Sequence, residues 1–337
     1  MLVFYTILRR GIESDPTKIL IDYYTEAQTR AQELIDEALR APPSPKGELL
    51  IIIPFRDRWD LTKSCLTTLA AQLLPVDLII RTILVDNGSV IPETLEKLQS
   101  AKGDFLSLNI EVLKANYPFN YSRLNNEAFK RFGLPTTKWV LFLNNDVELR
   151  DQNIVSRMTT CLESIPEAGV IGCTLLYPNR RIQHIFAAPG VKIIAAHPLK
   201  GVPYNPSYEW FAKPARPVAA VTGAVMMVRA EDFEKVGMFD ERLPTMGQDI
   251  DLCLALTRKS DSFSLALSSG ATYHNEGESR KGEINLSEAN CFYVKWTDYL
   301  KSPKLFSTAF TRWSERPMLR FLEPSKYPWR VFCRQVG

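Results

Sequence analysis

The chain has 337 residues, of which 45% are hydrophobic and 23% are charged, as in an ordinary soluble globular protein. Its formal net charge of +3 is too small to indicate nucleic-acid binding. This length allows one large domain or two smaller ones, with a substantial core.

The cysteines and the apolar segments indicate the cellular compartment in which the protein works. The six cysteines are widely separated and form no Cys-x-x-Cys pair, so neither a disulfide framework nor a structural zinc site is indicated. A reducing, cytoplasmic compartment fits this usage best. Residues 1–10 are apolar first and basic afterwards, the opposite order to a secretory signal. The longest later apolar run, residues 217–228, is interrupted by Thr222 and Gly223, so we expect no membrane span.

The first expected element is an amphipathic helix within residues 18–40. Its apolar positions recur among charged ones, at Ile19, Tyr23, Ala27, Leu34, Ile35 and Ala38. A proline-rich stretch, residues 41–45, follows and is typical of a stiff linker. Residues 1–45 are therefore predicted to be a helical extension with a proline-rich linker.

Strands and helices alternate after the linker. Four continuous apolar runs are predicted as strands, at residues 49–54, 78–85, 108–113 and 139–143. Helical spacing separates them, at residues 61–74, 91–98 and 121–132. This order indicates an α/β protein with a mostly parallel sheet covered on both faces.

The second half of the chain is less regular. Residues 219–228 are predicted as a buried strand, residues 231–236 and 249–257 as short helices, and a short strand is expected around Tyr273. The tail, residues 301–337, carries eight Lys or Arg against two acids, together with seven aromatic residues. Such a tail suits contact with an anionic membrane, and a solvated or packed tail is the alternative.

Polar side chains gather where the predicted parallel strands end, which is where such sheets bind ligands. The three clusters are residues 55–58 (Phe-Arg-Asp-Arg), 86–89 (Asp-Asn-Gly-Ser) and 144–146 (Asn-Asn-Asp). A strand-end turn needs only one Asn or Asp. Three such side chains in a row in the last cluster therefore suggest a bound group, with a plain turn as the alternative.

The type of ligand follows from what the clusters offer. The chain has no GxGxxG fingerprint and no GxxxxGK[ST] loop, which excludes two common nucleotide sites. Carboxylates and amides can instead hold a diphosphate through Mg²⁺ or Mn²⁺, because these cations prefer oxygen ligands. Asp146 is the natural metal carboxylate, with Asn144 or Asn145 contributing directly or through water. Asp86 has the oxygen atoms to contact a base or ribose, although its segment is also a common turn.

The second half adds further candidates. Gly223 would let a backbone approach a ligand closely. Gln248 and Asp249 open a predicted helix, where the helix dipole alone favours an acid, and where a carboxylate facing a cleft can equally act as a general base. His274 is a candidate metal ligand, with a structural role as the alternative, and Arg280 is a candidate phosphate ligand.

Taken together and in this order, these segments resemble the inverting nucleotide-sugar glycosyltransferases of family two. The resemblance covers residues 49–299 and rests on IIIPFRDR, ILVDNGS, NYPFNYSRLNNEAF, VLFLNNDVEL, VTGAVMMVRAEDFEKVGMFDE, GQDIDLCLAL and YHNEGESR. The most similar branch acts in bacterial O-antigen and cell-surface polysaccharide assembly and includes rhamnosyltransferases. The resemblance implies a GT-A domain over residues 46–300, a Rossmann-like α/β fold with a mixed, mostly parallel sheet flanked by helices.

The resemblance also implies roles at the donor site. Asp86 would contact the nucleotide base. The residues expected to wall the same pocket or to border the donor are Pro54, Phe55, Asp57, Arg123 and Asn125. For the last two, simple packing of their helix is the alternative.

The metal and the base are implied in the same way. Residues 144–146 stand where the family has its metal-binding Asp-x-Asp, here with Asn first, so Asp146 and the diphosphate would carry more of the metal charge. His274 matches a position that completes the metal site in some relatives. Asp249 matches the family's catalytic base, with Gln248 in place of the usual Glu or Asn. The implied cofactor is Mn²⁺ or Mg²⁺.

The implied reaction is transfer of a hexosyl or rhamnosyl group from a nucleotide-diphosphate sugar to a hydroxyl of a glycan or lipid-linked saccharide. Asp249 would take the hydroxyl proton, and the metal at Asp146 would stabilise the departing diphosphate. A lipid-linked acceptor would place this cytoplasmic protein at the inner face of the cell membrane. An inactive scaffold that binds nucleotide or glycan is the first rival, although such a protein needs no base. A sugar-nucleotide pyrophosphorylase is the second, but IPFRDRW lacks the glycine-rich loop that chemistry requires.

Overall fold

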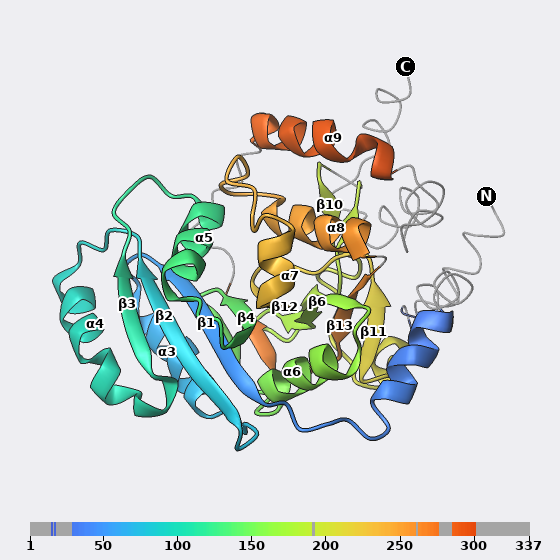
Figure 1. The fold of residues 1–337 in the computed structure, drawn as a ribbon, viewed down its shortest axis with the longest axis horizontal. Coiled ribbons are helices and arrows are strands. Elements are labelled where there is room, and N and C mark those ends of the chain that lie inside the picture. The colour runs from blue at the N-terminus through green and yellow to red at the C-terminus, as the bar shows by residue number, and fades with distance from the viewer. Residues whose placement is uncertain are drawn as a thin grey trace.

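The computed structural model describes Asp15, Thr17 and residues 29–190, 193–260, 262–275 and 285–300. Within these residues the chain is a layered α/β structure, with helices on both sides of a central sheet (Figure 1). Arg280 and the tail from residue 301 lie outside the described residues.

The central sheet has eight strands in the order β11-β13-β6-β12-β4-β1-β2-β3. Their bounds are β1 Gly47–Phe55, β2 Leu78–Asp86, β3 Ile110–Lys114, β4 Thr137–Leu143, β6 Ala168–Cys173, β11 Ala215–Val218, β12 Val225–Arg229 and β13 Phe263–Leu267. β1 is parallel to β2 and β4, β2 to β3, and β13 to β6, whereas β12 runs antiparallel to both of its neighbours and β11 antiparallel to β13. The predicted mixed, mostly parallel sheet is confirmed.

Helices cover the two faces of this sheet. Their bounds are α3 Trp59–Ala70, α4 Pro92–Asp104, α5 Tyr121–Phe132, α6 Ile154–Ser164, α7 Ala230–Lys235, α8 Gln248–Ser260 and α9 Leu286–Leu300, with short 3₁₀ turns η1 Leu106–Leu108 and η2 Glu209–Ala212. Successive side chains of a strand face opposite sides. Leu50 and Ile52 of β1 join a core with α5, α7 and α8, while Leu49, Ile51 and Ile53 join a core with α3, α4 and α6. Burial on both faces explains why this strand reads as a continuous apolar run.

Two smaller sheets lie beside the large one. One has the order β5-β14-β7-β8 and the other pairs β9 with β10. Their bounds are β5 Val147–Leu149, β7 Leu175–Leu176, β8 Ile182–His184, β9 Ala188–Pro189, β10 Ala195–Ala196 and β14 Thr272–His274. β14 pairs antiparallel with β5, and His274 lies opposite Val147. Val147 is the residue that directly follows the Asn-Asn-Asp cluster.

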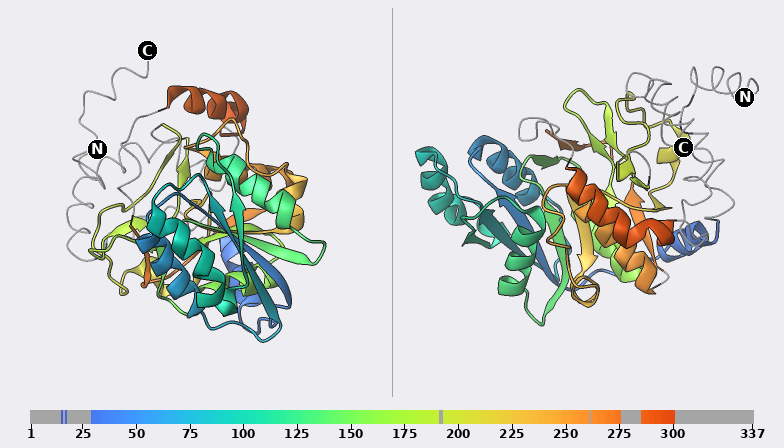
Figure 2. Two further views of the ribbon diagram at one scale, coloured as in Figure 1. Left: turned by 90° about the vertical axis from the view of Figure 1, so that its left-hand side faces the viewer. Right: turned by 90° about the horizontal axis from the view of Figure 1, so that it is seen from above.

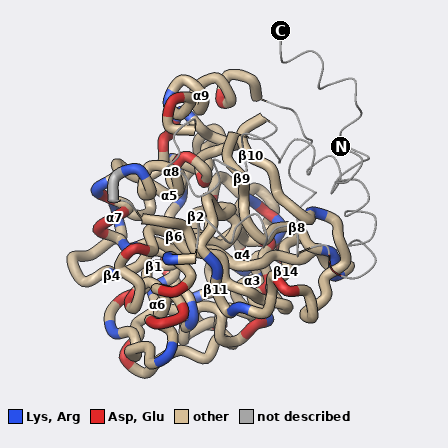
Figure 3. The backbone as a smooth tube through the Cα atoms, turned by 90° about the vertical axis from the view of Figure 1, so that its right-hand side faces the viewer, with Lys and Arg blue, Asp and Glu red and all other residues tan. Residues whose placement is uncertain are grey.

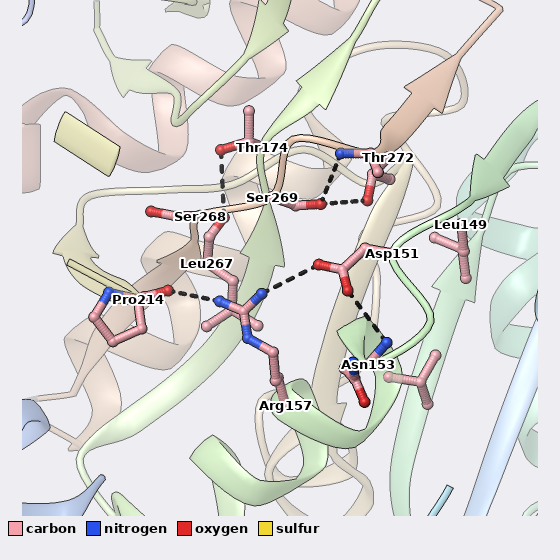
Figure 4. Close-up of polar contacts among 12 residues, drawn as sticks. Leu149, Asp151, Asn153, Arg157, Thr174, Pro214, Leu267, Ser268, Ser269 and Thr272 are labelled. Atoms are coloured by element: carbon pink, nitrogen blue, oxygen red, sulfur yellow. Dashed lines mark hydrogen bonds and ion pairs between the residues drawn. The ribbon is translucent and has the colours of Figure 1, made fainter. Parts of the chain in front are cut away.

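A polar junction holds the segment that leads into β14 (Figure 4). Arg157 of α6 donates to the Asp151 carboxylate at 3.2 Å and to the Pro214 carbonyl at 3.0 Å. The hydroxyls of Ser269 and Thr272 are 2.9 Å apart. The Asp151 N–H also donates to the carbonyl of residue 271, so the turn after β5 and the start of β14 are joined directly.

The N-terminal helix, where the structure describes it, packs on the domain. Residues 29–38 are helical, within the predicted range, and Ile35 is fully buried in the same core as α6. The Gln32 side chain donates to the Ala215 carbonyl at 3.1 Å, at the outer strand β11. This helix therefore covers one edge of the sheet, which would otherwise expose unpaired backbone groups.

The observed elements differ from the predicted ones in several places. The predicted strand at 219–228 begins only at Val225. Residues 219–221 are buried without being a strand. Val221 packs so closely on Gly172 that a Cβ added to Gly172 would lie 2.7 Å from the Val221 side chain. Burial alone accounts for that apolar run. Residues 91–98 are part of the longer α4, and the strand predicted from 108 begins at Ile110 after a 3₁₀ turn. No helix in the described residues is long and apolar enough to cross a membrane.

Candidate active site

The carboxyl ends of β1 and β2 form one side of the site. Phe55 lies opposite Asp86 in the strand register. Asp86 is 4% exposed, and its Oδ1 accepts the Ser89 N–H at 2.8 Å. The Asn87 side chain donates to the carbonyls of Ala115 and a second residue after β3, which fixes the turn. Pro54 is buried next to Phe55. The structure thus brings these three predicted pocket residues together, with Asp86 held by its own turn.

Asp57 has a structural task within the same loop. Its Oδ1 accepts the backbone N–H groups of Val90 and Ile91, both at 2.9 Å, at the start of α4. Asp57 and Arg58 both have left-handed backbones, with φ of 50° and 48°. Two successive residues of this kind are costly without glycine, so the surrounding contacts must hold the loop in place. The proposed contact of Asp57 with a nucleotide stays a prediction.

The three polar residues after β4 point in different directions. The Asn144 N–H donates to the Ala224 carbonyl at 3.0 Å. The Asn145 side chain donates to the Thr62 hydroxyl of α3 at 3.0 Å. Two of the three side chains reach His274 of β14: Asp146 Oδ1 lies 3.1 Å from its Nε2, and Asn144 Nδ2 lies 3.4 Å from the same nitrogen. The structure therefore brings Asp146 and Asn144 to His274, while Asn145 braces α3.

His274 is oriented by Gln183 of β8, a residue that we did not predict. Gln183 Oε1 lies 2.7 Å from His274 Nδ1, and Gln183 Nε2 lies 3.4 Å from the His274 carbonyl. An amide oxygen only accepts, so we assign the ring proton to Nδ1, which leaves the Nε2 lone pair facing Asp146. No spacing pattern in the sequence connects positions 183 and 274.

The pair of Asp146 and His274 fits a divalent cation. Adjacent ligands of an octahedral ion with bonds of about 2.1 Å lie about 3 Å apart, and the observed separation is 3.1 Å. Within the described ranges, no group of three His, Cys, Asp or Glu could hold a metal by itself. The remaining positions would therefore be filled by phosphate oxygens and water, as is common for Mg²⁺.

Asp249 lies at the first turn of α8 and contacts Gly223. Its Oδ2 accepts the Gly223 N–H at 2.9 Å, and its Oδ1 accepts the Ile250 N–H at 2.9 Å. The Tyr121 hydroxyl donates to the Gly223 carbonyl at 2.8 Å. A Cβ on Gly223 would lie 3.3 Å from the Tyr121 hydroxyl and 3.4 Å from Asp249 Cβ, so glycine suits this position. Because Ala224 holds Asn144, residues 223–224 link Asp249 to the end of β4.

The remaining predicted residues divide into two groups. Asn125 is fully buried and its Nδ2 donates to the Tyr121 carbonyl at 2.8 Å, which fits helix packing. Gln248 is also buried; among the described residues, its Oε1 and the Oδ1 of Asn125 accept no hydrogen bond. Arg123 is exposed and stacks 4.0 Å over the Tyr117 ring. Arg280 lies outside the described residues.

Known proteins share extensive sequence with this chain. The sequence profile described as Glycosyl transferase family 2 matches residues 50–183. The O-antigen biosynthesis protein RfbC of Myxococcus xanthus is 30% identical over 279 residues, which are 81% of this chain and 20% of that protein. The uncharacterized protein y4gI of Sinorhizobium fredii (strain NBRC 101917 / NGR234) is 31% identical over 253 residues, 74% of this chain and 27% of that protein. The chain thus spans about a fifth to a quarter of these relatives.

Solved structures show the same fold. GalNAc-T7 with UDP, GalNAc and Mn²⁺ superimposes with a TM-score of 0.57 at 12% identity, covering 86% of this chain and 57% of that one. The mannosyltransferase PcManGT of Pyrobaculum calidifontis, with GDP-Man and Mn²⁺, gives 0.51 at 13% identity, covering 94% and 93%. The fold is therefore that of the GT-A glycosyltransferases. The chain carries a glycosyltransferase family 2 domain.

Proposed function

We propose that the protein is a metal-dependent, inverting glycosyltransferase. It moves a hexosyl or rhamnosyl group from a nucleotide-diphosphate sugar to a hydroxyl of a glycan or lipid-linked saccharide. The observation that carries this proposal is the pairing of Asp146 with His274 at 3.1 Å, linked through residues 223–224 to the carboxylate of Asp249. The family 2 domain supports the reaction class.

The donor would lie along the carboxyl ends of β1, β2 and β4. Asp86 and Phe55 would contact the nucleoside, because they end adjacent strands. Asp146 and His274 would hold Mn²⁺ or Mg²⁺, which when bound neutralises negative charge on the diphosphate. Gln183 keeps the His274 ring in the orientation that this binding requires, a task that hydrogen-bond partners of metal-ligating histidines commonly perform.

Asp249 would act as the general base. The acceptor oxygen attacks the anomeric carbon while its proton passes to the Asp249 carboxylate, and the bond from that carbon to the diphosphate breaks. Attack from the side opposite the leaving group inverts the anomeric centre. The Gly223 N–H holds one carboxylate oxygen at 2.9 Å and so fixes the orientation of the base. A positioned base of this kind contributes about 10²–10⁴-fold to the rate.

The biological setting follows from similarity to RfbC. That protein is described by its role in O-antigen biosynthesis, and 81% of this chain matches part of it. We therefore place the reaction in assembly of a cell-surface polysaccharide, on the cytoplasmic side of the membrane. Peripheral membrane contact through the tail from residue 301 is part of this proposal. Equal co-sedimentation with anionic liposomes after removal of the tail would contradict that contact.

The deciding experiment is calorimetric titration with UDP-, GDP- and dTDP-sugars, with and without Mn²⁺ or Mg²⁺. We expect one nucleotide family to bind in a metal-dependent way, and Asp146→Asn to abolish that dependence. Asp77→Asn is the matched control, because Asp77 is an exposed carboxylate paired with Lys46 before β2 begins, away from the strand ends of the site. If no nucleotide sugar binds the unaltered protein, the donor site is wrong and an inactive scaffold becomes the better description.

A further inference from the structure

Glu288 of α9 is a buried carboxylate that takes no part in the proposed reaction. It is 2% exposed. Its Oε2 accepts the backbone N–H groups of Thr245 at 2.8 Å and Met246 at 2.9 Å. Its Oε1 accepts the Thr245 hydroxyl and the Asn285 side-chain N–H, both at 2.6 Å. Four donors therefore meet one carboxylate, and three of them belong to the segment before α8.

That segment leads directly into the helix that carries Asp249. Residues 245–247 precede α8, and the Gly247 carbonyl accepts the Asp251 N–H at 2.8 Å, as part of the first helical turn. Gly247 has φ of +80°, and a Cβ there would meet Ile194 at 2.6 Å. The chain therefore turns sharply at Gly247, and the position of residues 245–246 sets the direction in which the first turn of α8 begins.

The local sequence would direct Glu288 elsewhere. Asn285 caps α9, since its Oδ1 accepts the N–H groups of Ser287 and Glu288 at 3.1 and 3.3 Å. Asn-x-x-Glu is a capping-box pattern, in which the acid turns back to the N–H of the cap residue. Here the Glu288 carboxylate reaches residues 245 and 246 instead, and the Asn285 side chain holds it there. A buried carboxylate without such donors would be strongly destabilising, so these contacts are strongly held.

A second contact joins α9 to α8 about two helical turns after Glu288. The Trp296 indole N–H and the Lys295 ammonium each lie 2.7 Å from Asp251 Oδ1. The two helices lie together in Figure 1 and, seen from above, in Figure 2. α9 thus holds both α8 itself, through Asp251, and the segment before it, through Glu288. Of these two contacts, the one made by Glu288 acts on backbone N–H groups of the segment that leads to Asp249.

We propose that Glu288 is a positioning residue for Asp249. By holding residues 245–246, it sets the first turn of α8 and keeps the Asp249 carboxylate against the Gly223 N–H, where the acceptor proton must be received. This inference rests on the proposed function. Glu288 touches neither substrate nor reacting atom, so it orients the base and exchanges no proton with the substrate.

The test compares Glu288→Gln with Trp296→Phe. The glutamine keeps the size of the side chain but removes its charge and one of its acceptor oxygens. We expect kcat to fall about 10- to 100-fold, as for a misplaced catalytic group, with KM and calorimetric affinity for the donor within about twofold of the unaltered protein.

Amide hydrogen exchange supplies a readout that needs no activity. The N–H groups of Thr245 and Met246 should exchange at least about tenfold faster in Glu288→Gln. Trp296→Phe loses one hydrogen bond to Asp251 but leaves residues 245–246 held, so their exchange and kcat should stay within about twofold. Glu288→Asp, which is one methylene shorter, should behave like the glutamine variant.

The outcomes separate the two proposals. If Glu288→Gln keeps the kcat and the exchange rates of the unaltered protein, the positioning role is wrong. The same conclusion follows if donor affinity falls together with kcat, since that indicates general loss of structure. If the unaltered protein binds donor and metal but transfers no sugar, the proposed function fails and the positioning role fails with it. Faster exchange at 245–246 would then show only that Glu288 anchors the loop.

Discussion

At the scale of single residues, hydrogen bonds decide what the candidate site can do. The Asp146 carboxylate faces a ring nitrogen whose orientation depends on the amide of Gln183. The Asp249 carboxylate accepts the backbone N–H groups of Gly223 and Ile250. Each functional group therefore depends on a neighbour that carries no chemistry itself. Substitution of such a neighbour should change one step of the reaction and leave the fold intact.

Gln183→Leu is the first such test. Leucine fills the same buried space but accepts no hydrogen bond from His274 Nδ1. The ring can therefore turn or change tautomer. We expect affinity for Mn²⁺ to fall about 10- to 100-fold, as for other hydrogen-bond partners of metal ligands. Calorimetric titration of Mn²⁺ in the presence of donor measures this. Gln183→Glu, which keeps an acceptor for the ring N–H, should bind Mn²⁺ better than the leucine variant, and equal affinities would contradict the assignment.

The pKa of Asp240 predicts how the free energy of unfolding depends on pH. Hydrogen bonds from the Arg242 side chain, above all, lower the pKa of Asp240 to about 2. Because the folded-state pKa lies below the unfolded value, this carboxylate stabilises the fold above about pH 4 and loses that effect as the pH falls towards about 2. Asp240→Asn should therefore lower the free energy of unfolding by about 1 kcal/mol near neutral pH, a figure that allows for solvent screening. The loss should be smaller in acid.

Urea denaturation of both proteins at about pH 7 and about pH 3 measures this difference. The gap in free energy of unfolding between Asp240→Asn and the unaltered protein should narrow at the lower pH. Asp77→Asn is a control, because Asp77 is an exposed acid in a surface ion pair with Lys46. A gap that stays constant or widens in acid would rule out the ionised Asp240 as the stabilising form.

At the scale of elements, α5 and α9 hold the connection between α7 and α8 from two sides. Asn126 of α5 donates to the Phe239 carbonyl at 2.9 Å and accepts its N–H at 3.1 Å. Ser122 of α5 donates to the Leu243 carbonyl at 2.8 Å. Glu288 of α9 holds Thr245 and Met246, further along the same connection. The buried polar side chains of Ser122 and Asn126 are thus explained by this loop, which leads to Asp249.

The helix at residues 29–38 gives a prediction at the same scale. Ile35 is 0% exposed in the core, whereas its neighbour Leu34 is 36% exposed. Ile35→Ala should lower the free energy of unfolding by about 2–5 kcal/mol, and Leu34→Ala by about 0.5 kcal/mol. Chemical denaturation of both variants measures the two values. Equal small losses would mean that this helix is not part of the cooperative folding unit.

At the scale of the whole molecule, Lys or Arg positions and Asp or Glu positions are interspersed along the described backbone, as the side drawn in Figure 3 illustrates. The proposed chemistry needs no large surface region of one charge, because it depends on the carboxylates of Asp146 and Asp249. Most of the thiols in the described residues are buried. Cys65, Cys161, Cys173 and Cys253 are buried, and Cys291 is partly exposed.

Burial predicts the reactivity of these thiols. It raises the pKa of Cys161, Cys173 and Cys253 to about 12 and that of Cys65 still further. The thiolate is the reactive form, so alkylation by iodoacetamide at pH 8 should be at least about 100-fold slower in the folded than in the denatured protein. Peptide mass mapping measures each site, with Cys291 as the internal reference. Rapid labelling of all four would contradict the packing of both cores.

Local patterns in the sequence were enough to predict many of the elements and the ends of the strands. The helix predicted at 121–132 has those bounds in the structure, because Asn120 caps its start and a glycine follows its end. The α/β class also followed from the alternation of apolar runs and helical spacing, which depends on burial of each strand on both faces. The clusters at residues 86–89 and 144–146 do lie at strand ends, as parallel strands require.

Tertiary structure alone decided which of these residues meet. Gln183 and His274 are brought together because β8 and β14 flank β7, an order that no local pattern encodes. Gly223 contacts Asp249 and the next residue, Ala224, contacts Asn144, because β12 enters the sheet antiparallel beside β4. Contacts between distant positions depend on strand order and direction, which the packing of the whole chain determines. Local propensity, which acts over a few residues, therefore placed the candidate groups but could not pair them.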